Sequence, residues 1–185
     1  MSTIFKSGFL LFSLMLILGF GNKHFQQNKR VTTEFATPPK IGEIAPDINL
    51  LSANRSKSYK LSDLRGKLVL VNFWASLVAP CRFENPNIVK AYNQYKDKSF
   101  TNANGFTIYS VSLDSNLDNW KKAIVNDKLS WPYQVSDLKG YDSEVAAAYG
   151  IRSIPYNYLI DGDGKVLAIN LRGAQLSKTI QEYLK

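Results

Sequence analysis

Hydrophobic and polar residues follow one another along this chain in blocks that predict buried strands separated by one-sided helices. A continuous apolar run spans Leu68–Trp74 and is interrupted only by Asn72, which is typical of a strand buried on both faces. The segment GFTIYSVSLD at 105–114 predicts a second strand of the same kind. Two short segments before the first strand, DINLLS (47–52) and SYKLSDL (58–64), are expected to pair as a small hairpin.

Helical patterns follow each of the two buried strands. The first helix is expected to begin near Pro80, because a proline in the first turn lacks only an N–H that has no partner there. Its apolar positions are Ile88, Ala91, Tyr92 and Tyr95. A second helix is expected to be capped by Ser115. A third, short helix is expected to open at Asp142 or Ser143 and to stop at Gly150.

The last third of the chain predicts more strands and a closing helix. The segment WPYQVS (131–136) predicts a short strand, and YNYLIDGDGKVLAINL (156–171) predicts two strands joined by a turn. The DGDG sequence of that turn (161–164) resembles part of a calcium-binding loop. An EF-hand would need a glutamate at the position of Arg172, so a hairpin turn is favoured. Residues 174–185 predict an amphipathic helix.

Strands therefore alternate with helices before a terminal hairpin and helix. This order predicts an α/β fold, with a central mixed β-sheet flanked by helices and an N-terminal hairpin extension.

The N-terminal part of the chain has a different pattern from the rest. Residues 1–21 carry one early charge, Lys6, and then an apolar stretch of about 13 residues, which is typical of a secretory signal or a short membrane anchor. Residues 22–40 are polar and end in two prolines, so we expect a linker. The folded domain is then expected at 41–185. We expect this domain to be exported to the cell envelope or periplasm, and to be tethered to the membrane if the segment is retained.

Composition narrows the chemistry further. The 185 residues include 23 Lys and Arg against 15 Asp and Glu, a formal charge of +8. These cations are scattered, which favours a solvated basic surface and gives no sign of a nucleic-acid partner. The chain holds one histidine, His24 in the linker, and one cysteine, Cys81. An intramolecular disulfide, a cysteine-rich metal site and a histidine-based triad are thereby excluded, and no metal or cofactor is expected.

Four stretches read together resemble a known family. They are VNFWAS with APCRFENP (71–76 and 79–86), YSVSLD (109–114), YGIRSIPYNYLID (149–161) and DGKVLAINLRG (163–173). Their kind and order resemble the thioredoxin superfamily, specifically the exported TlpA/ResA-like thiol-disulfide oxidoreductases, over roughly residues 41–185. The resemblance implies a thioredoxin-like fold.

The resemblance also assigns positions in the motif W-A-S-L-V-A-P-C-R-F-E at 74–84. In the family, a first cysteine at a helix start attacks the substrate disulfide, and a second cysteine three residues later resolves the intermediate. Val78 stands at the attacking position, Leu77 replaces the usual tryptophan, and Cys81 stands at the resolving position. Valine forms no covalent intermediate, so a dithiol cycle within this chain is impossible.

Other family positions are kept. Glu84 matches a charged residue that assists proton movement near the thiols; the alternative is a carboxylate favoured in the first turns of a helix. Pro155 matches a proline preceded by a cis bond that faces the active site, and Ile154 before it would offer its backbone to an extended substrate. Pro80 and Trp74 would complete the site, although Trp74 can equally serve as packing at a strand end.

Two functions remain open. One is a monothiol enzyme that uses Cys81 with an external thiol, acting on envelope proteins or other thiol-bearing substrates. The other is a redox-inactive module that binds extended peptides or partner proteins beside Pro155, with Cys81 as a buried and inert residue. Peroxidase chemistry is disfavoured, because the cysteine that would react with peroxide falls at Val78.

Overall fold

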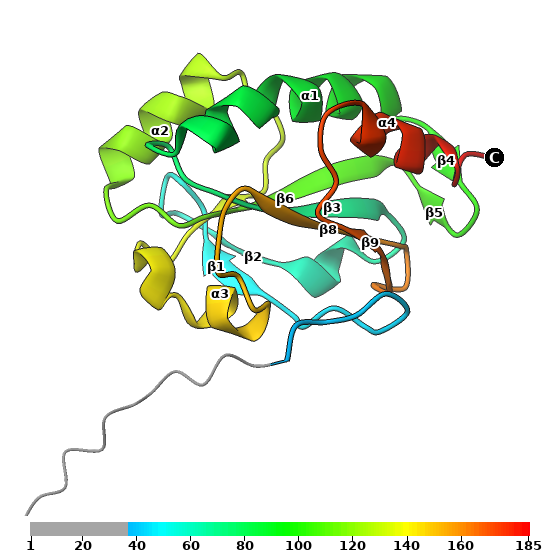
Figure 1. Cartoon of the computed structure of the whole chain (residues 1–185), viewed down its shortest axis with the longest axis horizontal. Helices are drawn as coiled ribbons and strands as arrows, with labels where there is room; N and C mark the ends of the chain where they lie inside the picture. Colours follow the sequence, from blue (N-terminus) through cyan, green and yellow to red (C-terminus); the bar gives the residue numbers. More distant parts are fainter. Residues whose placement is uncertain (1–36) are drawn as a thin grey trace, which may run out of the picture. The chain divides into compact units, whose positions relative to one another are not determined.

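The structure is a computed structural model that describes residues 37–185. Its centre is a five-stranded sheet in the order β7-β6-β3-β8-β9 (Figure 1). The strands are β3 (Leu68–Trp74), β6 (Phe106–Ser112), β7 (Gln134–Val135), β8 (Tyr156–Ile160) and β9 (Val166–Ile169). β3 runs parallel to β6 and antiparallel to β8, so the sheet is mixed, as the sequence predicted.

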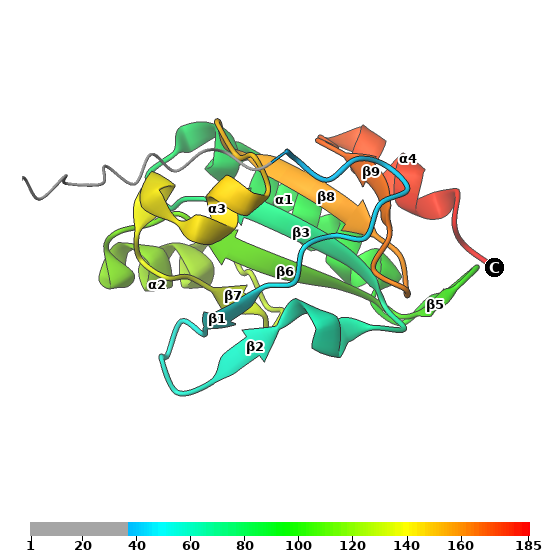
Figure 2. The ribbon, with the colours of Figure 1, turned by 90° about the horizontal axis from the view of Figure 1, so that it is seen from below.

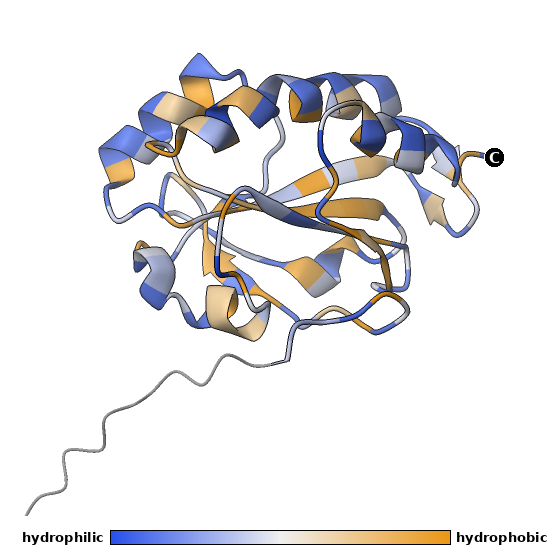
Figure 3. Cartoon of the chain, viewed as in Figure 1, coloured by the Kyte–Doolittle hydropathy of each residue, from blue (hydrophilic) through white to orange (hydrophobic). Residues whose placement is uncertain are grey.

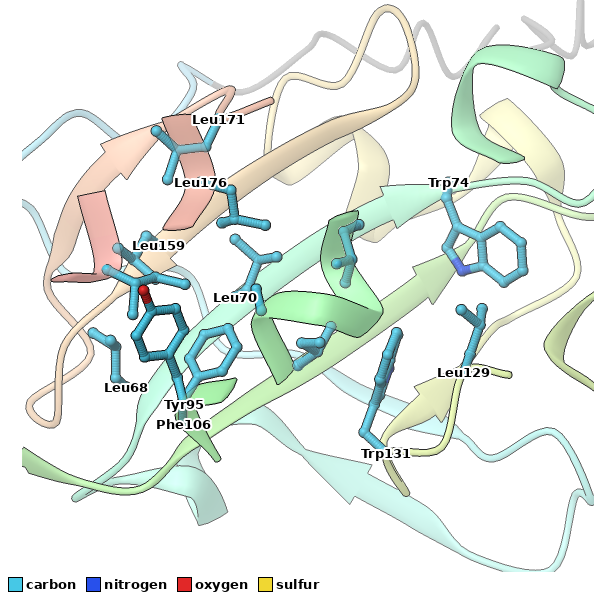
Figure 4. Packing of buried hydrophobic residues seen from close by; sticks show 14 of the residues in the cluster. Leu68, Leu70, Trp74, Tyr95, Phe106, Leu129, Trp131, Leu159, Leu171 and Leu176 are labelled. Atoms are coloured by element: carbon cyan, nitrogen blue, oxygen red, sulfur yellow. The ribbon is translucent and has the colours of Figure 1, made fainter. Parts of the chain in front are cut away.

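The central strand β3 is buried on both faces because its side chains alternate between two hydrophobic cores. Leu68, Leu70 and Trp74 join the first core, and Val69 and Val71 join the second. Figure 4 shows part of the first core, where side chains from β3, β6 and β8 pack together. This alternation confirms the strand that the apolar run predicted.

Helices cover the two faces of the sheet differently (Figures 1 and 2). The first core is closed by α1 (Ala79–Tyr95), α2 (Leu117–Asn126) and α4 (Ala174–Gln181). On the other face lie α3 (Glu144–Ala148) and the two-stranded sheet of β1 (Asn49–Leu51) and β2 (Ser58–Lys60). Two 3-10 turns, η1 and η2, span Leu61–Leu64 and Gly140–Asp142. In Figure 3 the helices alternate between apolar and polar residues, consistent with one buried side each.

Several details differ from the sequence predictions. The cap of α2 is Asn116 and not Ser115, so the sequence pattern misplaced the start of this helix by one residue. The Asn116 side chain accepts a hydrogen bond from the N–H of Asn119. The predicted strand at 131–136 is only the two residues of β7. A small hairpin of β4 (Ser99–Phe100) and β5 (Ala103–Asn104) was not predicted at all.

Both predicted hairpins are confirmed. β1 pairs with β2, and β8 pairs with β9, each in the antiparallel sense. The turn between β8 and β9 is held by the Asp161 carboxylate, which accepts hydrogen bonds from the N–H groups of Asp163 and Lys165. Asp161 therefore forms an Asx turn, in which an aspartate side chain closes the turn that follows it.

The predicted leader at 1–21 and most of the predicted linker lie outside the described residues. At the start of the described chain, Pro39 is buried, and Pro38 lies against Gly150. In this part of the protein no helix is both long enough and apolar enough to cross a membrane.

Candidate functional site

The motif singled out from the sequence lies where β3 ends and α1 begins. Trp74 ends β3 and is fully buried in the first core, so it packs and does not face solvent. Val78 has extended backbone angles and is the cap residue of α1, but its side chain makes no capping hydrogen bond. Pro80 lies in the first turn of the helix, as the sequence predicted.

Cys81 points into the first core. It is 1% exposed, and burial raises the pKa of its thiol to about 11. The backbone of Ala75 and the guanidinium of Arg172 work in the opposite direction, and the Asp114 carboxylate adds to the rise. The result is a protonated thiol at neutral pH, although Cys81 stands one turn into a helix.

Two groups brace the loop that leads into α1. The Asp114 carboxylate accepts hydrogen bonds from the N–H of Ser76 at 3.0 Å and from its hydroxyl at 2.6 Å. The Arg82 guanidinium donates to the carbonyl of Ser76 at 3.0 Å. Arg82 is itself held by the Asp127 carboxylate, which also accepts from the side chain of Asn85. The loop therefore has a fixed conformation without help from a second cysteine.

The Ile154–Pro155 bond is cis, which confirms the expectation from the family pattern. Ile154 is half-buried and packs against both cores. Within the described part of the chain, its backbone N–H and C=O make no hydrogen bond. These two groups are therefore free to pair with another extended backbone.

Glu84 is buried, and both of its carboxylate oxygens are engaged. One oxygen accepts from the N–H of Gly173 at 2.8 Å, and the other accepts from the Asn87 amide at 3.2 Å. Neither oxygen is hydrogen-bonded to Cys81. The role of Glu84 as a proton relay stays a prediction, and the geometry gives the carboxylate a tethering role.

Arg172 joins the site, and the sequence reasoning did not single it out for function. Its guanidinium donates to the carbonyl of Pro155 and, at 2.7 Å, to the carbonyl of Leu171. Burial lowers the pKa of Arg172, and the negative charge of Glu84 counteracts this effect. The available signal was weak: an arginine beside a glycine between a strand and a helix.

The rim of the site is apolar. Leu77 is 78% exposed and Val78 is half-buried. Phe83 is 79% exposed and lies further along α1. Contiguous exposed apolar surface marks contact sites in proteins, so the neighbouring Leu77 and Val78 are the apolar residues of the motif that a partner can contact. Among residues 37–185, no group of three or more His, Cys, Asp and Glu side chains is arranged to hold a metal ion.

Comparison with known proteins decides the family. Residues 41–169 match the model of the AhpC/TSA family. The chain belongs to this family. Thiol-disulfide oxidoreductase ResA of Bacillus thuringiensis subsp. konkukian is 32% identical over 146 residues, which is 79% of this chain and 78% of that protein. Thioredoxin-like protein YneN of Bacillus subtilis is 32% identical over 143 residues, covering 77% of this chain and 78% of YneN.

Solved structures of thiol-disulfide oxidoreductases have a similar fold. The thioredoxin domain of a thiol-disulfide oxidoreductase from Bacteroides vulgatus is 39% identical with a TM-score of 0.70, covering 79% of this chain and 99% of that one. A thiol:disulfide interchange protein from Bacteroides sp. is 38% identical with a TM-score of 0.69, covering 79% and 91%. The fold is therefore thioredoxin-like, and the chain is a relative of the ResA-type thiol-disulfide oxidoreductases.

Proposed function

We propose that this protein is a redox-inactive member of its family, which binds an extended segment of a partner protein beside the Ile154–Pro155 loop. The observation that carries the proposal is the burial of Cys81, the chain's single thiol, behind a valine at the position of the attacking cysteine. Burial raises the pKa of Cys81 to about 11, so the thiol is almost entirely protonated at pH 7. A thiol that is neither ionised nor accessible does not attack a disulfide.

Binding is supported by what the site retains. The free backbone groups of Ile154 provide a pairing edge, and Leu77 and Val78 provide apolar contact next to it. Backbone pairing gives affinity for an extended segment, and neighbouring apolar contacts give preference for particular side chains.

A monothiol enzyme is the second candidate. It is favoured by the presence of Pro80, Cys81, Glu84 and Pro155 in the family positions, and by the Arg172 guanidinium, whose charge lowers the pKa of Cys81. In such an enzyme the Cys81 thiolate would attack the disulfide of a substrate, form a mixed disulfide and release one substrate thiolate. The thiolate of an external thiol would then attack the substrate sulfur of the mixed disulfide, release Cys81 as a thiolate and leave that substrate half in a disulfide with the external thiol.

We further propose that the domain works in the cell envelope, as an exported protein. The support is the apolar segment followed by a polar one at the start of the chain, together with relatives named thiol-disulfide oxidoreductase ResA.

The rate at which iodoacetamide alkylates Cys81 tests the proposal. The rate is measured against pH on the folded full chain in a mild detergent. The double variant Cys81→Ala with Leu77→Cys supplies the reference, because its one thiol stands at a position that is 78% exposed. We expect Cys81 to react at least about a hundredfold more slowly than the reference at pH 7, and to react readily only after unfolding.

A rate close to the reference, with an inflection well below the ordinary thiol pKa of about 8.5, would favour the monothiol enzyme instead. A second readout is independent of the thiol chemistry. In a strain that lacks the protein, the Cys81→Ala variant should restore the wild-type phenotype under the binding proposal and fail to do so under the monothiol mechanism.

A further inference from the structure

The outer side of α1 carries an apolar strip that the proposed peptide site does not use. Phe83 is 79% exposed, and Pro86 and Lys90 follow at the third and seventh positions after it, on the same side of the helix. Cys81, two residues before Phe83, lies on the opposite, buried side. The strip is therefore a surface separate from the thiol.

This strip leads into a hollow between α1 and the end of α2. The hollow has a volume of about 390 Å³ and is lined by Pro86, Val89, Lys90, Asn126, Asp127 and Lys128. A hollow of this volume is large enough to receive a large apolar side chain of a partner.

The charge at the hollow is positive. The negative charge of Asp127 is balanced by the Arg82 guanidinium, which donates hydrogen bonds to both carboxylate oxygens. Neither Lys90 nor Lys128 forms an ion pair within residues 37–185. The hollow thus combines an apolar floor with two ammonium groups that have no carboxylate partner in this part of the chain.

The positive charge of the hollow disfavours two possible occupants, a second copy of this chain and the chain's own segment at 22–36. A second copy of this chain, docked through the same face, would bring the same lysines together. The chain's own segment at 22–36 holds three Lys and Arg residues against a single Glu34, so it is basic as well. In addition, the described chain begins on the side of the sheet opposite to α1 and α2 (Figure 1).

We propose that Phe83 and this hollow bind an acidic amphipathic helix of a partner protein. One apolar side chain of that helix fills the hollow against Pro86 and Val89, and its carboxylates pair with Lys90 and Lys128. Helices with an apolar stripe are commonly bound in this way, by a groove that receives residues spaced three or four apart. The surface would give the protein a second point of contact, independent of the Ile154–Pro155 loop.

The test uses two synthetic amphipathic helices with the same leucine stripe, one with glutamate and one with lysine on the polar side. Binding of each labelled peptide to the detergent-solubilised full chain is measured by fluorescence anisotropy at low and high salt. We expect the glutamate peptide to bind at least about tenfold more tightly than the lysine peptide, and salt to reduce this difference.

Matched variants locate the binding. Phe83→Ser should weaken binding of the glutamate peptide by about tenfold. Ile44→Ser, which changes an exposed apolar residue paired with Lys165 at the β8–β9 turn, should leave it unchanged. Lys128→Gly is the sharpest variant, because Lys128 has a φ of +57°, where glycine is favoured. This variant should raise the urea midpoint of unfolding and still weaken peptide binding.

Three results would overturn the proposal. The first is equal binding of the two peptides, or no binding of the glutamate peptide. The second is unchanged affinity in Phe83→Ser. The third is a dimer, seen by sedimentation, that Phe83→Ser dissociates, because the surface would then belong to a second copy. The Cys81→Ala variant should bind both peptides as the wild type does, so this test is independent of the redox question.

Discussion

The Glu84 carboxylate accepts a hydrogen bond of 2.8 Å from the backbone N–H of Gly173, a residue 89 positions later in the chain. The bond ties α1, which carries Cys81, to the loop that opens α4. The neighbouring Arg172 donates to the carbonyl of Pro155, so the tether extends to the loop of the proposed peptide site. A residue that the family pattern suggests for proton movement is therefore also a structural link between the two halves of the site.

Removing this link should destabilise the fold. Glu84→Ala leaves the N–H of Gly173 without its acceptor, and we expect the free energy of unfolding to fall by about 1–3 kcal/mol in urea titrations. Glu84→Gln keeps an acceptor oxygen and should lose less, about 1 kcal/mol. Asn87→Ala, which removes only the weaker contact of 3.2 Å, is the control and should cost least. Equal stability of wild type and Glu84→Ala would contradict the tether.

Restoring the missing cysteine should restore a disulfide. Val78 is the cap residue of α1 and Cys81 follows in its first turn, so Val78→Cys recreates the Cys-x-x-Cys spacing on an otherwise intact loop. With oxidised glutathione as the oxidant, we expect the two thiols to form an intramolecular disulfide, seen as the loss of two hydrogens by mass spectrometry.

Leu77→Cys is the matched control for this experiment, because it adds an exposed cysteine one residue earlier. It should yield a mixed disulfide with glutathione and leave Cys81 reduced. If Val78→Cys behaves in the same way, the loop does not have the geometry of a dithiol site.

Cys81 itself should contribute through packing. Cys81→Ala removes a buried sulfur atom and should cost about 1 kcal/mol of the free energy of unfolding. Cys81→Ser has nearly the same size, but it places a hydroxyl in an apolar cluster and should cost about 1–3 kcal/mol. The free energy of unfolding of each variant, measured by thermal or urea unfolding, shows whether Cys81 stabilises the core by packing. A serine variant as stable as the alanine variant would mean that water or a polar group reaches this position.

The pair of Asp127 and Arg82 should make stability depend on pH in acid. Burial of Asp127 acts to raise its pKa, but hydrogen bonds from Arg82 and Asn85 outweigh it, and the pKa lies below its ordinary value. A lowered pKa contributes stability that is present above about pH 4 and is lost as the pH falls through the folded-state value.

We therefore expect Asp127→Asn to lower the free energy of unfolding at pH 7 and to flatten its decline below pH 4, measured by urea titrations across this range. Glu144→Gln is the matched control, because Glu144 pairs with Lys139 at 3.3 Å on the exposed surface. Exposed pairs contribute little, so this variant should follow the wild type. A free energy of unfolding that falls more steeply below pH 4 in Asp127→Asn than in the wild type would contradict a lowered pKa of Asp127.

The sequence by itself determined the framework of this protein. The short, largely apolar runs that became β3 and β6 predicted strands buried on both faces, and both are central strands of the sheet. Pro80 marked the start of α1, and the Asp-Gly turn marked the last hairpin, because these signals act over a few neighbouring residues. The absence of the attacking cysteine at Val78 could likewise be read directly.

Only the tertiary structure decided how the site is held and whether its thiol is accessible. Asp114 reaches Ser76 across 38 positions, and Glu84 reaches Gly173 across 89. The pKa of Cys81 depends mainly on how completely the first core encloses it. Such contacts arise when distant elements pack against each other, and no local pattern of residue types encodes the distance between them. Burial and long-range hydrogen bonding therefore had to be read from the folded chain.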